Sequence, residues 1–354
     1  MVTIKDIARV VGFSPSTVAR ALNHDPRITA DTTARVKSVA KELGYVAHLG
    51  ARLMAGGRSN LIGLIVPDVE NQFYATLAQA MSECSEEGFQ LLLSVTDDDP
   101  EKEHQHLRAL VEARASGVVV VPTHRPTKES VELLERLACV QLIRNVPALK
   151  TDWFAFDDQR GVYEATRHLI ELGHRRIAYV GSTDKLSTGA SRLKGYQLAL
   201  SEAGIERDPS LIVTLTPRAE QTRDAFVELY RQQSPTAVVA GGSSITVGLL
   251  DCIHTLKLSV PQELSIVGFG DPPWFEWWGP GMTTIHLPVR EIALTSAACL
   301  IRRIRDKATD SSAVTYKAQH VVHQPLLLIR GSTGEPARKA SHKLPAAGRR
   351  REKV

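Results

Sequence analysis

The stretch TIKDIARVVGFSPSTVARALN, residues 3–23, predicts two short helices joined by a tight corner. Thr3 precedes a helical run and Asp6 follows three residues later, which is the spacing of a capping box at a helix N-terminus. Gly12 supplies the backbone freedom that the corner needs. Two short helices that meet through such a corner form a helix-turn-helix.

The second helix is expected to begin at Pro15, with Ser14 as its N-cap. Ala8 is small enough to let this helix approach the first one closely, and Val18 fills the gap between them. The alternative is a pair of amphipathic helices within a larger helical domain. The N-terminal position and the charge of the stretch favour the helix-turn-helix.

In a helix-turn-helix, the first turn of the second helix reads base edges in the DNA major groove. Its exposed polar side chains here are Ser16, Thr17 and Arg20. Arg20 has the donors to bind O6 and N7 of a guanine, whereas Thr17 suits a phosphate equally well. Pro15 offers only apolar contact, for example to a thymine methyl group.

A third helix is predicted from ITADTTARVKSVAKELGY. Either Thr29 or Asp31 caps its start, and Gly44 ends it. A headpiece of three helices, residues 1–45, then closes at Tyr45.

The net charge of +4 conceals an asymmetry along the chain. Residues 1–60 hold nine Lys and Arg against four Asp and Glu, residues 61–329 hold 26 against 33, and residues 330–354 hold eight against two. A basic head on an acidic body places a polyanion at the head. Nucleic acid is therefore the expected partner.

Composition and motifs narrow the class of protein further. The 354 residues contain 43% hydrophobic and 23% charged residues, which is ordinary for a globular protein with large cores. No apolar run is long enough to span a bilayer and no signal-peptide pattern is present, so we expect no membrane partner and a cytoplasmic location. The scattered cysteines are interpreted as reduced core residues: Cys84, Cys139, Cys252 and Cys299.

Enzyme signatures are missing. The sequence lacks a phosphate-binding GxxxxGK, a GxSxG nucleophile elbow, HExxH and a dinucleotide fingerprint. Glu103, His104 and His106 form EHQH on a polar helix, which we interpret as a solvated face rather than a metal site. We predict a protein that is not an enzyme and that has no cofactor or metal.

From Leu61 onward, short apolar strands alternate with helices. The first set of strands is LIGLIVP, FQLLLSV, GVVVVP and CVQLIR, with helices beginning at Phe73, Pro100 and Lys128. The second set is RIAYVGS, LIVTLT, TAVVAG and LSIVGFG, with helices near 160–172, 191–203, 219–232 and 245–256. Such alternation predicts an α/β core of two lobes, each a parallel sheet flanked by helices, with ligands at the carboxyl ends of the strands.

The headpiece sequences VTIKDIARVVGFSPSTVARALN and ITADTTARVKSVAKELGY resemble those of the lac-repressor (LacI/GalR) family of bacterial regulators, and the resemblance covers residues 2–330. It implies an all-α headpiece joined to a periplasmic-binding-protein-like core, residues 61–330. The chain of such a core crosses between the lobes three times, here near 155–160, 280–290 and 310–320. It also implies a homodimer that reads the halves of a pseudo-palindromic operator in double-stranded DNA.

The segment VAHLGARLMAGGRSN, residues 46–60, resembles the family's hinge helix, which orders on operator DNA. Met54 stands where the family places a leucine that wedges into a central base step. A plain flexible linker is the alternative. The full set of expected DNA contacts is Thr3, Ser14, Pro15, Ser16, Thr17, Arg20, Asn23, Arg27, Tyr45, Arg52 and Met54.

The resemblance also implies an effector pocket between the lobes. Asp271, at the end of VGFGD, matches an acid that accepts hydrogen bonds from sugar hydroxyls, and Arg192 matches the pocket arginine. The expected pocket set is Asn71, Phe73, Asp157, Thr188, Arg192, Ser243, Asp271 and Trp274. The alternative role of these polar residues is a structural ion pair or a helix cap, and that of Trp274 is packing.

Gly242 and Ser243 replace the Asn-Asp pair of many sugar-responsive members, and the loss of that carboxylate favours an anionic effector. We therefore expect a repressor of a catabolic operon that responds to a sugar acid, or else to a neutral sugar. A sugar-binding receptor without DNA-regulatory activity is the rival function. The basic tail, residues 331–354, is expected to be disordered and lacks the leucine heptads of a tetramer-forming helix.

Overall fold

The computed structural model describes residues 2–22, 25, 27–45, 59–308 and 317–337. The chain forms two compact units, Met1–Ser59 and Asn60–Val354. Three of the expected DNA-contacting residues, Asn23, Arg52 and Met54, lie outside the described residues, as do most of the hinge segment and residues 338–354 of the tail.

The described residues of the first unit form three helices: α1 (Ile4–Val11), α2 (Pro15–Leu22) and α3 (Ala30–Glu42). Its core is built from small and medium apolar side chains: Ile7, Ala8, Val11, Val18, Ala21, Val36 and Ala40. Between α1 and α2 the chain turns at Gly12, whose φ of 77° is in the left-handed region that glycine tolerates.

Local hydrogen bonds fix the ends of these helices. The backbone N–H of Thr3 donates to the Asp6 carboxylate at 2.9 Å, and the Thr3 hydroxyl donates to the same oxygen at 2.7 Å. These bonds hold the pKa of Asp6 below its usual value. The hydroxyl of Thr29, rather than Asp31, caps α3 by accepting from the N–H of Thr32 at 3.3 Å.

The second unit begins with a six-stranded, all-parallel sheet in the order β11-β5-β4-β3-β1-β2. Its strands are β1 (Leu61–Val66), β2 (Gln90–Val95), β3 (Gly117–Val120), β4 (Ala138–Leu142), β5 (Asp152–Phe156) and β11 (His320–His323). Its helices are α5 (Gln72–Met81), α6 (Pro100–Glu112), α7 (Lys128–Arg136) and α12 (Val289–Ala308), with the short helix η1 (Ser82–Glu87) after α5. This sheet and its helices are called the first lobe.

A second six-stranded sheet has the order β12-β10-β9-β8-β6-β7, and only β12 runs antiparallel to its neighbour. Its strands are β6 (Ile177–Ser182), β7 (Ile212–Leu215), β8 (Ala237–Gly241), β9 (Ser265–Phe269), β10 (Thr283–His286) and β12 (Leu326–Leu328). Its helices are α8 (Asp158–Glu171), α9 (Ser187–Glu202), α10 (Ala219–Gln233) and α11 (Ser243–Leu256), with short helices η2 (Pro209–Leu211) and η3 (Pro273–Phe275). This is the second lobe.

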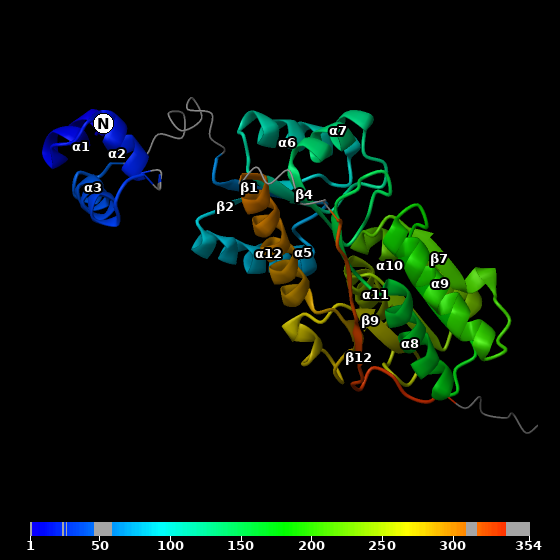
Figure 1. The fold of residues 1–354 in the computed structure, drawn as a ribbon. Coiled ribbons are helices and arrows are strands. Elements are labelled where there is room, and N and C mark those ends of the chain that lie inside the picture. Colours follow the sequence, from blue (N-terminus) through cyan, green and yellow to red (C-terminus); the bar gives the residue numbers. More distant parts are fainter. Residues whose placement is uncertain (1, 23–24, 26, 46–58, 309–316, 338–354) are drawn as a thin grey trace, which may run out of the picture. The chain divides into compact units, whose positions relative to one another are not determined.

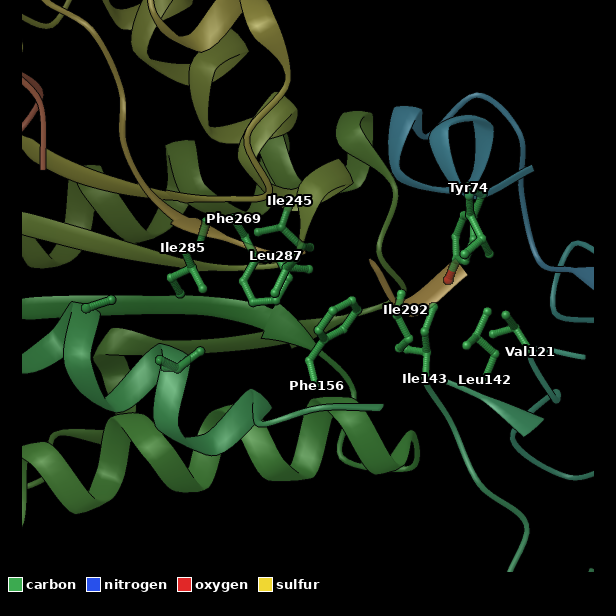
Figure 2. Close-up of a cluster of buried hydrophobic side chains, with 14 of the residues drawn as sticks. Tyr74, Val121, Leu142, Ile143, Phe156, Ile245, Phe269, Ile285, Leu287 and Ile292 are labelled. Carbon is green, nitrogen blue, oxygen red and sulfur yellow. The ribbon is translucent and has the colours of Figure 1, made fainter. Parts of the chain in front are cut away.

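Helices cover both faces of each sheet. In the first lobe, α6 and α7 lie on one face while α5 and α12 lie on the other (Figure 1). Successive side chains of a strand point to opposite faces, and both faces of β1 are apolar. Ile65 packs in the core under α6 and α7, and Leu64 packs in the larger core on the other face. Buried side chains from both lobes, including Phe156, Phe269, Leu287 and Ile292, continue that larger core through the junction (Figure 2).

The chain passes between the lobes at 156–158, 286–289 and 323–326, because consecutive elements on either side of each range belong to different lobes. We expected the third crossing near 310–320, and this was wrong. Strand β11 still pairs with β5 in the first lobe, and Pro325, which has no N–H for a ladder, precedes the move into the second lobe as β12.

The boundary predicted between core and tail was also wrong. Residues 331–336, here called the strap, belong to the second lobe. Ser332 is fully buried: its hydroxyl donates to the carbonyl of Ile266 at 2.7 Å and accepts from the N–H of Thr283 at 2.8 Å. Local composition suggested disorder, but side-chain hydrogen bonds to strands more than 45 residues away hold the strap in place.

His174 ties the strap to the sheet and gives a pH prediction. It is fully buried, with Nε2 2.8 Å from the carbonyl oxygen of Gly334 and Nδ1 2.8 Å from the Thr236 hydroxyl. Burial lowers its pKa below the usual value, so at acidic pH the unfolded chain binds a proton that the folded chain resists. The free energy of unfolding should therefore fall as the pH drops below about 6.5.

Urea unfolding between pH 7 and pH 5 measures this effect. The wild type should lose stability more steeply than His174→Gln, by up to about 1.4 kcal/mol per pH unit for one proton. His124→Gln, at an exposed position, is the control and should keep the wild-type slope. Equal slopes for the wild type and His174→Gln would contradict the assignment.

Candidate functional sites

The first candidate site is the exposed face of α2 in the headpiece. Ser14 opens the helix, and its Oγ accepts from the N–H of Thr17 at 3.1 Å. The hydroxyls of Ser16 and Thr17 lie 2.9 and 2.8 Å from the same oxygen, while Pro15 is exposed at the first helical position. The first turn therefore presents three hydroxyl groups held in one small network.

Arg20 follows one turn later on the same helix and is exposed. Its side chain makes no hydrogen bond or ion pair within the described part of the headpiece, so its five donors are available. Arg27, by contrast, is paired with Asp25 at 2.6 Å, and this contact lowers the pKa of Asp25. Tyr45 is half-buried against the headpiece core, with its N–H donating to the Ala40 carbonyl at 2.8 Å.

The second candidate site lies at the carboxyl ends of the strands in the core. Asn71 caps α5 in the first lobe, with Oδ1 accepting from the N–H of Phe73 at 3.1 Å. Its Nδ2 lies 3.5 Å from the hydroxyl of Ser244, at the start of α11 in the second lobe. Phe73 itself packs edge-on against Phe156 with ring centroids 6.1 Å apart. The two lobes thus meet beside the expected effector residues.

In the second lobe, α9 carries Thr188 and Arg192, and both are buried. The Arg192 Nε donates to Asp158 at 2.7 Å, its Nη1 donates to the carbonyl of Gly241 at 3.0 Å, and its guanidinium lies 4.1 Å from the Phe269 ring centroid. Burial raises the pKa of Asp158 and the Arg192 charge opposes that rise.

Asp157, the acid expected in the pocket, does something else in the structure. It caps α8 by accepting from the N–H of Arg160 at 3.0 Å. The neighbouring Asp158 is the residue that contacts Arg192. The cap at α8 is the alternative role that the sequence left open for Asp157.

Asp271 is already engaged by an arginine. Arg330 donates to it through Nη1 at 2.8 Å and Nη2 at 3.1 Å, and Nδ1 of His286 lies 3.5 Å away. Trp274 is half-buried and packs edge-on against Phe275, with ring centroids 4.5 Å apart. The structure thus gives both residues the structural role that was the alternative.

Two glycines and a serine lie where β8 and β9 end. A Cβ placed on Gly242 would lie 3.7 Å from Nη1 of Arg192, and one placed on Gly270 would lie 3.0 Å from the Ser243 hydroxyl. Gly270 also has a φ of 82°, which disfavours any other residue. The ends of these strands therefore come together beside Arg192 without a side chain to cover it from positions 242 and 270.

The first lobe holds a charged cluster that sequence reasoning missed. Arg144 follows β4 and is 7% exposed. It donates two hydrogen bonds to Asp98 and one, of 3.3 Å, to the carbonyl of Pro122. The sequence CVQLIR did contain a signal for this cluster, because its last residue, Arg144, is a charged residue that follows an apolar strand.

Glu103 adjoins this cluster, and the expected solvated face of EHQH was wrong for it. The residue is fully buried, and its carboxylate accepts from the N–H of Thr123 at 2.7 Å. Burial raises its pKa. Among the described residues no group of His, Cys, Asp and Glu is arranged to hold a metal ion.

A separate hollow of about 430 Å³ lies at the opposite end of the second lobe, where β6 begins. Its lining includes Arg175, Arg207, Tyr196 and Ile205, and none of the expected effector residues takes part. It has no polar side chain that is buried and unpaired. The converging polar groups beside Arg192 are therefore the better candidate for a ligand site.

Sequence and structure comparisons place these features in context. The model of "Bacterial regulatory proteins, lacI family" matches residues 3–48, and that of "Periplasmic binding protein-like domain" matches residues 166–333. The chain is similar to the HTH-type transcriptional regulator DegA of Bacillus subtilis, at 32% identity over 94% of this chain and 98% of that protein. The Escherichia coli ribose operon repressor is 30% identical over 94% of this chain and all of that protein.

Solved structures agree on the fold. The transcriptional regulator CelR–cellobiose complex matches with a TM-score of 0.68 at 26% identity, over 94% of this chain and 100% of that one. A lac repressor dimer bound to operator and an anti-inducer matches with a TM-score of 0.78 at 21% identity, over 94% and 99%. No helix in the described part of the chain is both long and apolar enough to cross a membrane.

Proposed function

This chain belongs to the lacI family of bacterial regulatory proteins, and from that premise we propose that it represses a catabolic operon as a cytoplasmic homodimer. Each headpiece binds one half of a pseudo-palindromic operator in double-stranded DNA, with α2 in the major groove. The observation that carries this proposal is the first turn of α2, where the exposed Ser14 and Ser16 and the half-buried Thr17 form one hydroxyl network and Arg20, exposed one turn later, has no side-chain partner in the described part of the headpiece.

The other residues that we expect to contact DNA are also proposed, and the observations that support each of them differ. Arg27 must leave Asp25, or carry it along, to reach a phosphate. Thr3 and Tyr45 are proposed to contact the phosphate backbone of the DNA, because hydrogen bonds at the neighbouring helix ends fix their positions. Asn23, Arg52 and a Met54 wedge in a central pyrimidine–purine step rest on the family resemblance alone.

The effector is proposed to be a small polar molecule held beside Arg192, and a sugar acid is the first candidate. Support comes from the buried Arg192 beside Gly242, whose Nη2 has no partner in the described chain, and from Asn71, Thr188 and Ser243 around the same strand ends. The Asp158 carboxylate favours a neutral sugar as the second candidate, since it can accept from hydroxyls. Asp157, Phe73, Asp271 and Trp274 are proposed to shape the site rather than to bind directly.

The effector then acts by changing how the lobes close. A ligand shifts this equilibrium only by its differential affinity for the two states, and a coupling of about 1–3 kcal/mol changes operator affinity about 5- to 150-fold. Asn71 belongs to the first lobe and Ser244 to the second, so a change in lobe closure would change the contact between them. Titration of a labelled operator complex with an aldonate and with its parent hexose tests which class releases DNA.

Selection of bound duplexes from a random pool tests the DNA proposal. The wild type should enrich a pseudo-palindrome, and Arg20→Ala should relax the sequence at one base position per half-site, at a cost of about 1–3 kcal/mol. Lys37→Ala on α3 is the charge-matched control and should keep the preferred sequence. An unchanged preference in Arg20→Ala would remove that residue from base reading.

A further inference from the structure

The two lobes present similar charged groups at their facing strand ends. In the first lobe, Arg144 is anchored by Asp98 and by the carbonyl that follows β3. In the second, Arg192 is anchored by Asp158 and by the carbonyl of Gly241 that ends β8. Each wall therefore carries one buried guanidinium held by one carboxylate and one backbone oxygen.

Tyr74 connects the two groups. It is a residue of α5 that is 9% exposed, and its hydroxyl points away from the helix toward Leu142 and Ile143, the residues before Arg144 (Figure 2). The same helix begins at its cap Asn71, whose Nδ2 lies 3.5 Å from the Ser244 hydroxyl, and Gly242, two residues before Ser244, adjoins Nη1 of Arg192. The Tyr74 hydroxyl makes no hydrogen bond within the described residues.

The unused hydrogen-bonding groups on these walls include guanidinium donors from both lobes. Nε of Arg144 and Nη2 of Arg192 have no partner in the described chain, whereas both oxygens of Asp98 already accept from Arg144. Asp271 is held by Arg330, whereas Oε1 of Glu103 and one oxygen of Asp158 are acceptors without a partner in the described chain. A ligand that complements free guanidinium donors supplies acceptors, and a carboxylate is the strongest small acceptor for a guanidinium.

We propose that Arg144 and Arg192 bind the two ends of one effector, which is a small diacid such as a sugar with a carboxylate at each terminus. Each lobe contributes one guanidinium, and the hydroxyl of Tyr74 contacts the polar middle of the ligand. Because the ligand joins the two walls, it favours the closed arrangement of the lobes. This inference rests on the proposed effector site and narrows its ligand class.

A matched ligand series tests the inference with the full-length protein. Galactose, galactonate and galactarate share one stereochemistry and carry no, one or two terminal carboxylates, and glucose, gluconate and glucarate form a second series. The two acids of each series are open chains, so their comparison isolates the second carboxylate, whereas the parent sugar is a ring. Dissociation constants come from calorimetry at constant ionic strength. We expect a diacid to bind about 10- to 100-fold more tightly than its monoacid, as for one added charge-assisted pair.

The test variant removes the first-lobe pair as a whole. Arg144→Gln with Asp98→Asn takes away both charges and so leaves no buried charge alone, and it should erase the preference for the diacid while keeping monoacid affinity. Arg144→Lys should retain part of the preference. Arg136→Gln, an exposed arginine at the end of α7, is the control and should behave as the wild type.

The outcomes separate the two proposals. Equal affinity for monoacid and diacid, or a diacid preference that survives the double variant, overturns the two-arginine inference and leaves the sugar-acid proposal standing. Binding of neutral sugars alone overturns both. If no compound binds while operator binding is intact, the diacid inference and the sugar-type effector both fail, and the DNA-binding function remains.

Discussion

Replacement of Asp152 by alanine should lower the free energy of unfolding of the core by about 3–5 kcal/mol, because it removes a fully buried carboxylate that accepts two hydrogen bonds from Arg303. Asp152 is fully buried at the start of β5. Nε and Nη2 of Arg303, on α12, each donate to it at 2.8 Å, and the N–H of Gln319 donates at 2.8 Å. One carboxylate thus joins a strand, a helix and the segment leading into β11.

Urea denaturation followed by circular dichroism measures the loss. Asp224→Ala, which removes an exposed carboxylate 2.9 Å from Arg223, is the control and should change stability by less than about 1 kcal/mol. A similar small change for Asp152→Ala would show that water or rearrangement compensates Arg303. Operator binding should be kept at temperatures where the core remains folded, because the headpiece has its own core.

The second large effect is expected at Arg192. Arg192→Met should abolish the response of operator binding to the effector and should also destabilise the core by about 3–5 kcal/mol at pH 8, since Asp158 then stays buried without its partner. Replacing both residues, as Arg192→Met with Asp158→Leu, should recover most of the stability without recovering the response. That pattern separates a ligand contact from a merely structural one.

The pH dependence of the single variant follows from the buried acid. Burial already raises the pKa of Asp158, and removal of the arginine raises it further. A folded-state pKa above the unfolded value favours the folded state at low pH, and this contribution is lost as the pH rises through the folded pKa. Arg192→Met should therefore be closer to wild-type stability at pH 5 than at pH 8, measured by thermal unfolding, and an equal deficit at both would contradict this account.

Much of the fold could be predicted because its signals are local. The starts expected for the helices at Pro100, Lys128 and near 219 match α6, α7 and α10. Strand β5 was absent from the predicted sets of strands, because it is only five residues long and begins at a charged Asp152, whose partner Arg303 is 151 residues away. Helix α12 was missed as well, because the rule of alternating strands and helices applies within one lobe, and α12 follows β10 of the other.

The candidate site was harder to predict for the same reason. The sequence alone does not distinguish the roles of neighbouring acids such as Asp157 and Asp158. The backbone turn into α8 determines that Asp157 caps the helix and that Asp158 accepts from Arg192. The partner of Asp271 is 59 residues away, after β12. Motif matching located the strand ends where the polar groups gather, and only the structure shows how these groups pair with one another.

The late position of β11 and β12 has a consequence for biosynthesis. The headpiece needs only the first 45 residues and can fold while the remainder is being translated. Each sheet of the core, however, receives an outer strand from residues 320–328, and the strap closes the second sheet later still. A nascent chain that stalls before this point would carry a folded headpiece and an incompletely folded core. The headpiece should therefore become resistant to protease long before the core does.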